Sequence, residues 1–202
     1  MGQVKDSVRV WDLLVRLSHW FLAVMFFVAY FTEDELLSVH VWAGYAVGVI
    51  IVLRVLWGFI GPKHARFSDF PFGPWKVWKY FLDLVQFRSR RYIGHSPAGG
   101  AMIMVLMVFL GLVVWSGLKT YAIEENAGPL AFSLTTTVGD NQVAGASKSG
   151  SGGDWWEDFH ELISNLTLGL VILYILGVLL ASFAHGENLA WSMITWRKRP
   201  NE

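Results

Sequence analysis

MIMVLMVFLGLVVW, at residues 102–115, is the stretch of sequence that decides the fold. No charged side chain interrupts it, and the apolar character extends roughly from Gly99 to Gly117. A helix needs about 20 apolar residues to cross the hydrocarbon core of a bilayer. The segment therefore predicts a membrane-spanning helix.

Three other segments have the length and apolar content of a membrane span. Together with the first, they run roughly over residues 11–31, 39–60, 99–117 and 156–183. Because every backbone group in a bilayer must be hydrogen-bonded within the protein, such segments cross as helices. The predicted fold is all-α: a single integral membrane domain over residues 1–202, built as a four-helix bundle.

The composition agrees with lipid as the solvent. Of the 202 residues, 54% are hydrophobic and only 16% are charged, whereas about 25% are charged in an average soluble domain. The formal net charge is +0, so bulk charge gives no basis for nucleic-acid binding. The chain has no cysteine, which excludes disulfides, iron–sulfur clusters, thiolate catalysis and covalently attached c-type haem.

Two connecting segments have distinctive compositions. WKVWKYFLDLV, at residues 75–85, places lysines among aromatic and aliphatic side chains, which is typical of a helix lying along a membrane interface. GDNQVAGASKSGSGG, at residues 139–153, is rich in glycine and serine. That composition predicts a flexible loop.

Lysine and arginine are distributed unequally between the two ends of the predicted bundle. One end has only Lys119 and Lys148. The other end has twelve basic residues: Lys5, Arg9, Lys63, Arg66, Lys76, Lys79, Arg88, Arg90, Arg91, Arg197, Lys198 and Arg199. Basic residues concentrate in cytoplasmic loops, so both termini are expected in the cytoplasm.

Two histidines stand at matched depths in the predicted bundle. His40 lies in the first turn of the second span and His160 about one turn into the fourth, and both spans enter from the outer side. Two neutral imidazoles opposed across a bundle are what bis-histidine ligation of haem requires. Alternatively, each is an interfacial or hydrogen-bonded histidine without a ligand. Gly44 and Gly48 could form a smooth groove for a flat ring, or could serve ordinary close packing of helices.

His19 lies deeper, on the first span. Fourteen residues beyond His160 is about 21 Å further along the fourth helix, on nearly the same face. The residue there is Tyr174, so no second histidine matches His19 in depth.

In addition, the chain resembles the bacterial di-haem cytochrome b-561 group, which includes the cytochrome b subunits of nickel–iron hydrogenases. The resemblance covers nearly the whole chain and rests on the order and spacing of several motifs together. These motifs are VRVWDLLVRLSHW (8–20), HVWAGYAVGVIIVLRVLWGFIGPKHARFSDF (40–70), GHSPAGGAMI (94–103), GPLA (128–131), FHELISNLTL (159–168), ASFAHGENL (181–189) and MITWRKR (193–199).

The resemblance implies haem b held at two levels of the bilayer. His40 and His160 would ligate the outer haem, and His19 would be one ligand of the inner haem. The family's other inner ligand is a histidine at the position of Tyr174, where this chain departs from the pattern. Three outcomes remain: an inner haem on His19 and Tyr174, a five-coordinate haem on His19, or no inner haem.

Two arginines lie at the inner ends of their spans. A bidentate guanidinium from Arg16 or Arg54 suits a haem propionate. Equally, each could be an interfacial arginine whose charge reaches the aqueous boundary.

The resemblance implies a b-type cytochrome of the bacterial inner membrane that passes electrons between a quinone and a redox partner protein. That partner would be a cytochrome c or an oxidoreductase subunit. Whether the chain is an enzyme in its own right stays open, because the scaffold also resembles superoxide-oxidising cytochromes that reduce quinone. Acidic residues such as Glu124 and Glu125 in the predicted outer loops would repel superoxide. A haem-free structural subunit is a third alternative.

Overall fold

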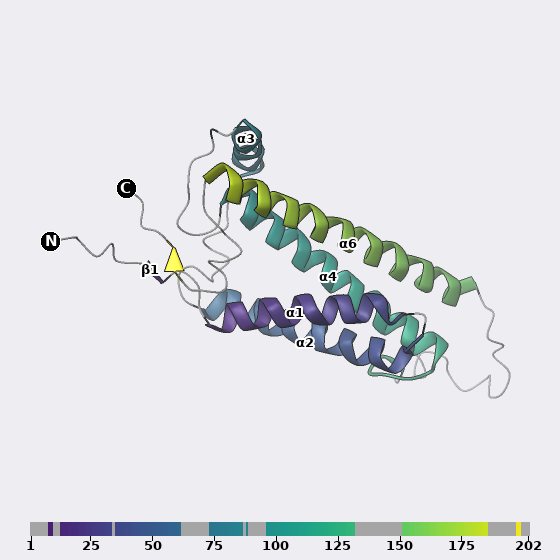
Figure 1. The fold of residues 1–202 in the computed structure, drawn as a ribbon. Helices are drawn as coiled ribbons and strands as arrows, with labels where there is room; N and C mark the ends of the chain where they lie inside the picture. Colours follow the sequence, from purple (N-terminus) through teal and green to yellow (C-terminus); the bar gives the residue numbers. More distant parts are fainter. Residues whose placement is uncertain are drawn as a thin grey trace, which may run out of the picture.

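The computed structural model describes residues 8–9, 13–33, 35–61, 73–86, 88, 96–131, 151–185 and 197–198. These residues form five helices and one pair of short strands (Figure 1). In chain order the elements are β1 (Val8–Arg9), α1 (Leu13–Phe31), α2 (Leu37–Ile60), α3 (Pro74–Val85), α4 (Pro97–Glu124), α6 (Ser151–His185) and β2 (Arg197–Lys198).

Four of the described helices, α1, α2, α4 and α6, are long and apolar enough to cross a membrane. This confirms the all-helical fold, with four long apolar helices that are consistent with the expected four-span bundle. Two bounds differ from the expectation. α4 continues past residue 117 to Glu124, where Lys119 and Tyr121 have apolar stems and polar tips that suit a lipid boundary.

α6 begins at Ser151, earlier than expected. Residues 151–153 therefore belong to a helix and not to the predicted loop, whose remaining residues 139–150 lie outside the described part of the chain. Asp154 stands in the first turn of α6, where a negative charge complements the positive end of the helix dipole. This interaction helps the helix to begin in a glycine-rich stretch.

The four long helices pack as two pairs. α1 and α2 form an antiparallel hairpin, α4 packs along α6, and α2 joins the pairs by packing against α4 (Figure 1). Phe26, Val47 and Leu110, from three different helices, form the central cluster. A hydrogen bond of 2.6 Å from the Tyr30 hydroxyl to Asn165 Oδ1 links α1 to α6. Many large apolar side chains of the described helices are exposed, as expected for helices solvated by lipid.

The expected helix between the second and third spans is present as α3. It packs against α4 and α6 with Tyr80 and Leu84 buried, while Trp75 and Trp78 are exposed. Figure 1 shows α3 end-on, so it runs across the direction of the long helices. This arrangement suits an interfacial helix, and its location at the membrane surface stays a prediction.

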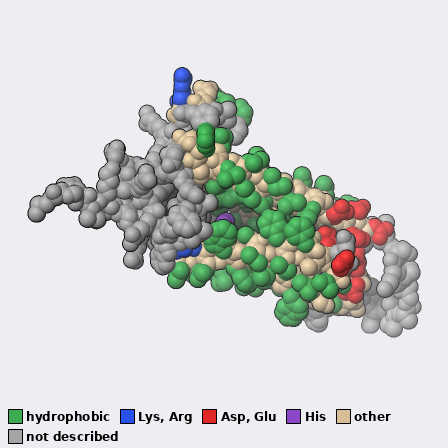
Figure 2. Space-filling model, in the orientation of Figure 1, with side chains coloured by type: hydrophobic (Ala, Val, Ile, Leu, Met, Phe, Trp, Pro, Cys, Tyr) green, Lys and Arg blue, Asp and Glu red, His purple; other side chains and the backbone are tan. Residues whose placement is uncertain are grey.

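β1 and β2 pair antiparallel, with Val8 opposite Lys198 and Arg9 opposite Arg197. The segments before α1 and after α6 therefore meet at one end of the bundle. The chain accordingly crosses the bundle an even number of times. Figure 2 shows Asp and Glu side chains gathered at the opposite end.

Candidate functional site

Near the acidic end, the four long helices enclose a cavity that contains both His40 and His160, called here the histidine-pair cavity. It has about 970 Å³ of space, part of which is open to the outside. Cofactor sites are mostly apolar with a few polar groups. Its lining includes Phe26, four valines, two leucines and two glycines.

The two imidazole rings lie against each other in this cavity. Their centroids are 6.0 Å apart, and the ring planes are nearly perpendicular, at 87°. Two metal–nitrogen bonds of roughly 2.0–2.1 Å each, added to the distance from each nitrogen to its ring centre, give a separation close to this one. The pair is therefore spaced to bind one metal atom between its rings.

A backbone carbonyl orients the ring of His40. Its Nδ1 is 2.8 Å from the carbonyl oxygen of Ala29 on α1. A carbonyl only accepts, so Nδ1 carries the proton and donates it, and Nε2 keeps a free lone pair. Ala29 lies in the last turn of α1, where carbonyls lack partners within their own helix.

A serine on α4 orients the ring of His160. The Ser116 hydroxyl is fully buried and lies 2.8 Å from His160 Nδ1. The same hydroxyl donates its proton to the Val113 carbonyl at 3.1 Å. With its proton used in this way, the hydroxyl oxygen is placed to accept from Nδ1 in the tautomer that leaves Nε2 of His160 with a free lone pair.

Glycines make room for the rings and for a flat ligand. A Cβ added at Gly117 would lie 2.9 Å from His160 Cε1, so only glycine leaves space for this ring. A Cβ at Gly44 would meet nothing within 4 Å, and Gly44 lines the cavity, as the groove hypothesis expected. Gly48 is different, because a Cβ there would approach the Val114 side chain to 3.1 Å. Gly48 thus serves close packing of α2 against α4.

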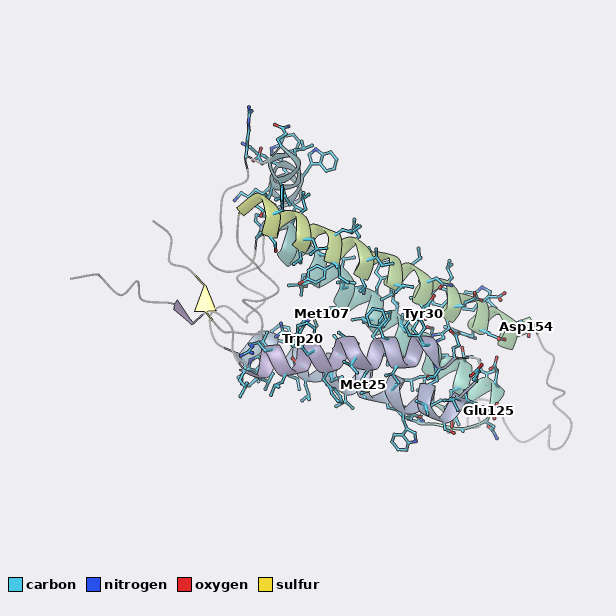
Figure 3. The ribbon with its side chains drawn as sticks, in the orientation of Figure 1. Trp20, Met25, Tyr30, Met107, Glu125 and Asp154 are labelled. Carbon is cyan, nitrogen blue, oxygen red and sulfur yellow. The ribbon has the colours of Figure 1, made fainter. Side chains whose placement is uncertain are left out.

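Polar groups surround the mouth of the histidine-pair cavity. Glu33, Glu124 and Glu125 line it, together with Tyr45 and Tyr121. Figure 3 shows Glu125 at the same end of the bundle as Asp154. The Thr120 hydroxyl oxygen, also at the cavity, is buried without a hydrogen-bond partner among the described residues. A ligand in this cavity would therefore meet hydroxyl donors and negative charge at its outer edge.

A second cavity of similar size, about 960 Å³, lies between the same helices towards the β1–β2 end. Tyr174 lines it together with His19 and Arg54, and it is called here the Tyr174 cavity. Within the described residues, His19 contacts the ring of Trp20, with centroids 5.7 Å apart. No such ring contact joins His19 to Tyr174. The structure thus brings the three expected residues to one cavity without pairing them as His40 and His160 are paired.

One residue that the sequence suggested as a haem propionate partner, Arg16, lies outside both cavities. Arg16 lies on α1 one turn before His19 and lines neither cavity. Sequence analysis missed Ser116 and Gly117. The signal that could have found them is the polar and small pair SG at the outer end of an otherwise aliphatic span.

The donor set indicates which kind of metal group fits. Among the described residues, no group of three or more His, Cys, Asp or Glu side chains could hold a metal ion. Two imidazoles fall short of the four ligands that a bare ion such as zinc takes. They suffice as the axial ligands of a macrocycle that supplies the equatorial nitrogens itself. The apolar lining and the open space beside Gly44 fit such a flat group.

Comparison with known proteins also points to a haem-binding protein. Residues 10–196 match the family described as prokaryotic cytochrome b561. A probable Ni/Fe-hydrogenase B-type cytochrome subunit of Rhizobium leguminosarum bv. viciae is 29% identical over 151 residues, covering 61% of this chain and 63% of that protein. A probable Ni/Fe-hydrogenase 1 B-type cytochrome subunit of Escherichia coli K12 is 27% identical over 161 residues, covering 61% and 68%.

The matched region thus spans less than two thirds of the Rhizobium protein's length. No solved structure matches the chain. The family match covers nearly the whole sequence and agrees with the four apolar helices. The chain therefore belongs to the prokaryotic cytochrome b561 family of haem b-binding membrane cytochromes.

Proposed function

We propose that this membrane cytochrome transfers electrons between a quinone and a redox partner protein, using haem b held by His40 and His160. The observation that carries the proposal is the contact of these two rings, with centroids 6.0 Å apart, inside one shared cavity. Both Nδ1 atoms are occupied by hydrogen bonds, so both Nε2 atoms are available to iron. Hydrogen-bonded partners of this kind orient ligating histidines in metal sites generally.

Bis-histidine ligation favours electron transfer over catalysis at the iron. Haem b supplies a one-electron centre, and two protein ligands leave no open coordination position for oxygen. Apolar side chains line part of the cavity beside the two histidines. The protein's contribution is thus to hold, orient and shield the group.

Charge at the cavity mouth indicates the class of redox partner. Glu33, Glu124 and Glu125 line the opening, and this negative charge attracts a basic protein surface and repels an anion such as superoxide. A basic cytochrome c or the basic face of an oxidoreductase subunit fits. The relatives' names, which denote cytochrome subunits of Ni/Fe-hydrogenases, support a partner of the second kind.

The orientation in the bacterial inner membrane follows from the basic residues. We propose that the β1–β2 end and both termini face the cytoplasm, because lysine and arginine concentrate there in the sequence. The histidine-pair cavity and its acidic mouth then face the outside. Electrons pass there between the haem and the redox partner protein. The other molecule that exchanges electrons with the haem is a quinone dissolved in the lipid.

The Tyr174 cavity is proposed as an altered second haem position. His19 offers one ligand, Tyr174 replaces the second histidine, and Arg54 is positioned to meet a propionate. Arg16, which lines neither cavity, is the weaker propionate candidate. A phenol binds iron only after losing its proton, which is unfavourable near neutral pH. This cavity therefore holds a haem with unequal ligands or holds none.

The test of the proposed function is the optical spectrum of the purified chain and of two single variants. His40→Ala and His160→Ala should each abolish the low-spin haem b bands at the histidine-pair cavity. Trp42→Ala is the matched control, because Trp42 lies two residues from His40 on α2 and is 73% exposed. A full reduced α-band in both histidine variants would overturn the assignment. A wild-type chain without any haem would indicate the structural-subunit alternative.

A further inference from the structure

Helix α4 supplies no ligand to the histidine-pair cavity, yet two of its consecutive residues contact His160. Ser116 Oγ lies 2.8 Å from Nδ1, and the missing Cβ of Gly117 leaves the space that Cε1 occupies. Ser116 thus contacts the ring through a hydrogen bond, and Gly117 leaves the space that the ring occupies. His40, by contrast, is oriented by a backbone carbonyl that no side-chain substitution removes.

We propose that Ser116 and Gly117 are positioning residues that fix how His160 binds haem iron. They hold the imidazole with Nε2 towards the metal and its plane perpendicular to that of His40. The inference rests on the proposed function, since it concerns the orientation of a ligand to the same haem. It goes further by assigning the orientation to a helix that carries no ligand.

The hydroxyl of Ser116 is well placed to control the ligand's electron density. It donates to the Val113 carbonyl at 3.1 Å while accepting from His160 Nδ1, and hydrogen bonds in such a chain polarise one another. A hydrogen bond from Nδ1 raises the basicity of the ligating nitrogen. A more basic ligand stabilises ferric iron, so this contact lowers the reduction potential of the haem.

The perpendicular arrangement has a spectroscopic consequence of its own. The ring planes meet at 87°, and low-spin ferric haem with perpendicular axial imidazoles gives a strongly anisotropic electron paramagnetic resonance signal. Parallel planes give a rhombic signal with three resolved features. The shape of the signal therefore reports the angle between the ring planes of His40 and His160, without any measurement of activity.

Substitutions at Ser116 test the hydrogen bond. Serine and alanine are close in size, so Ser116→Ala should fold while removing the hydroxyl that contacts His160 Nδ1. We expect a higher midpoint potential, an altered ferric signal and roughly 10–100-fold weaker haem binding. Ser116→Thr, which keeps the hydroxyl, should restore the wild-type values. Thr167→Ala is the control, because Thr167 is also fully buried and its hydroxyl bonds only the Ile163 carbonyl.

Substitutions at glycine test the space around the ring. Gly117→Ala would force a Cβ to 2.9 Å from His160 Cε1, whereas a Cβ at Gly111 on the same helix meets nothing within 4 Å. Gly117→Ala should therefore reduce low-spin haem content, and Gly111→Ala should not. Equal spectra for these two variants would contradict the steric role.

All measurements use the full chain purified in detergent. An anisotropic wild-type signal that changes in Ser116→Ala and returns in Ser116→Thr supports the inference. A wild-type haem whose potential and signal are the same in Ser116→Ala overturns it and leaves the proposed function standing. Loss of haem in neither His40→Ala nor His160→Ala would overturn both.

Discussion

The histidine-pair cavity and the Tyr174 cavity are nearly equal in volume, about 970 and 960 Å³, but differ in how their polar groups are arranged. In the first, two imidazoles face each other at 6.0 Å and each Nδ1 has a partner. In the second, His19 and Tyr174 line the space without a ring contact between them. Helix packing thus provides two similar spaces, and a few side chains decide what each can bind.

The difference extends to the charge around each cavity. Glutamates line the histidine-pair cavity, whereas among the residues that the structure describes Arg54 is the one charged residue lining the Tyr174 cavity. A haem propionate would find a cationic partner at the second cavity and hydroxyl donors at the first. The geometry of the ligands therefore favours haem at the histidine-pair cavity. The charge of the lining favours haem at the Tyr174 cavity.

Removing one histidine from each cavity should give the largest contrast. His160→Ala deletes half of a ligand pair whose geometry is complete, so nearly all low-spin haem b should be lost. His19→Ala deletes a histidine that has no imidazole opposite, so most of the low-spin bands should remain. Reduced-minus-oxidised spectra per mole of protein measure both. Equal losses in the two variants would contradict the comparison.

Fusions to alkaline phosphatase test which cavity faces outside. The enzyme folds only outside the cytoplasm, so a fusion after Glu202 should be inactive and a fusion between residues 145 and 150 should be active. The physical reason is the excess of lysine and arginine at the β1–β2 end of the chain. Immunoblots of both fusions control for expression. The reverse pattern would place the histidine-pair cavity on the cytoplasmic side.

Salt should slow electron exchange with a basic cytochrome c several-fold. The Debye length falls from about 30 Å at about 0.01 M to about 8 Å at about 0.15 M, which screens the glutamates at the cavity mouth. Combined Glu33→Gln, Glu124→Gln and Glu125→Gln should flatten this dependence. Asp83→Asn on α3, at the other end of the bundle, is the control. A rate independent of salt would argue against an acidic docking face.

The spans and the depths of His40, His160, His19 and Tyr174 could be predicted because they follow from hydropathy and from counting residues along a helix. The direction in which each side chain points around its helix axis could not be predicted. Gly44 and Gly48 differ by one turn and looked equivalent, yet one lines a cavity and the other packs against Val114.

Contacts between distant parts of the chain were also beyond sequence reasoning. The hydrogen bond between Ser116 and His160 joins residues 44 positions apart and depends on how α4 lies against α6. The pairing of β1 with β2 involves two residues on each side, too few to show any periodic pattern. In both cases packing determines the contact, and local composition carries little sign of it.

The smallest expected effect, and the sharpest test of the comparison, comes from Tyr174→His. Imidazole is smaller than phenol, so the Tyr174 cavity should accept the substitution with little loss of stability. A histidine there would stand at the depth of His19 and could complete a second ligand pair. Low-spin haem per chain should rise from about one towards two, since neutral imidazole binds iron without first losing a proton.

The double variant Tyr174→His with His19→Ala should lose the gain, because the new histidine then has no opposite ligand. Pyridine haemochrome assays and ferric electron paramagnetic resonance measure the count and the spin state. Two equivalent bis-histidine haems in the unaltered chain would mean that another residue ligates the second iron and that the two cavities are more alike than their side chains indicate.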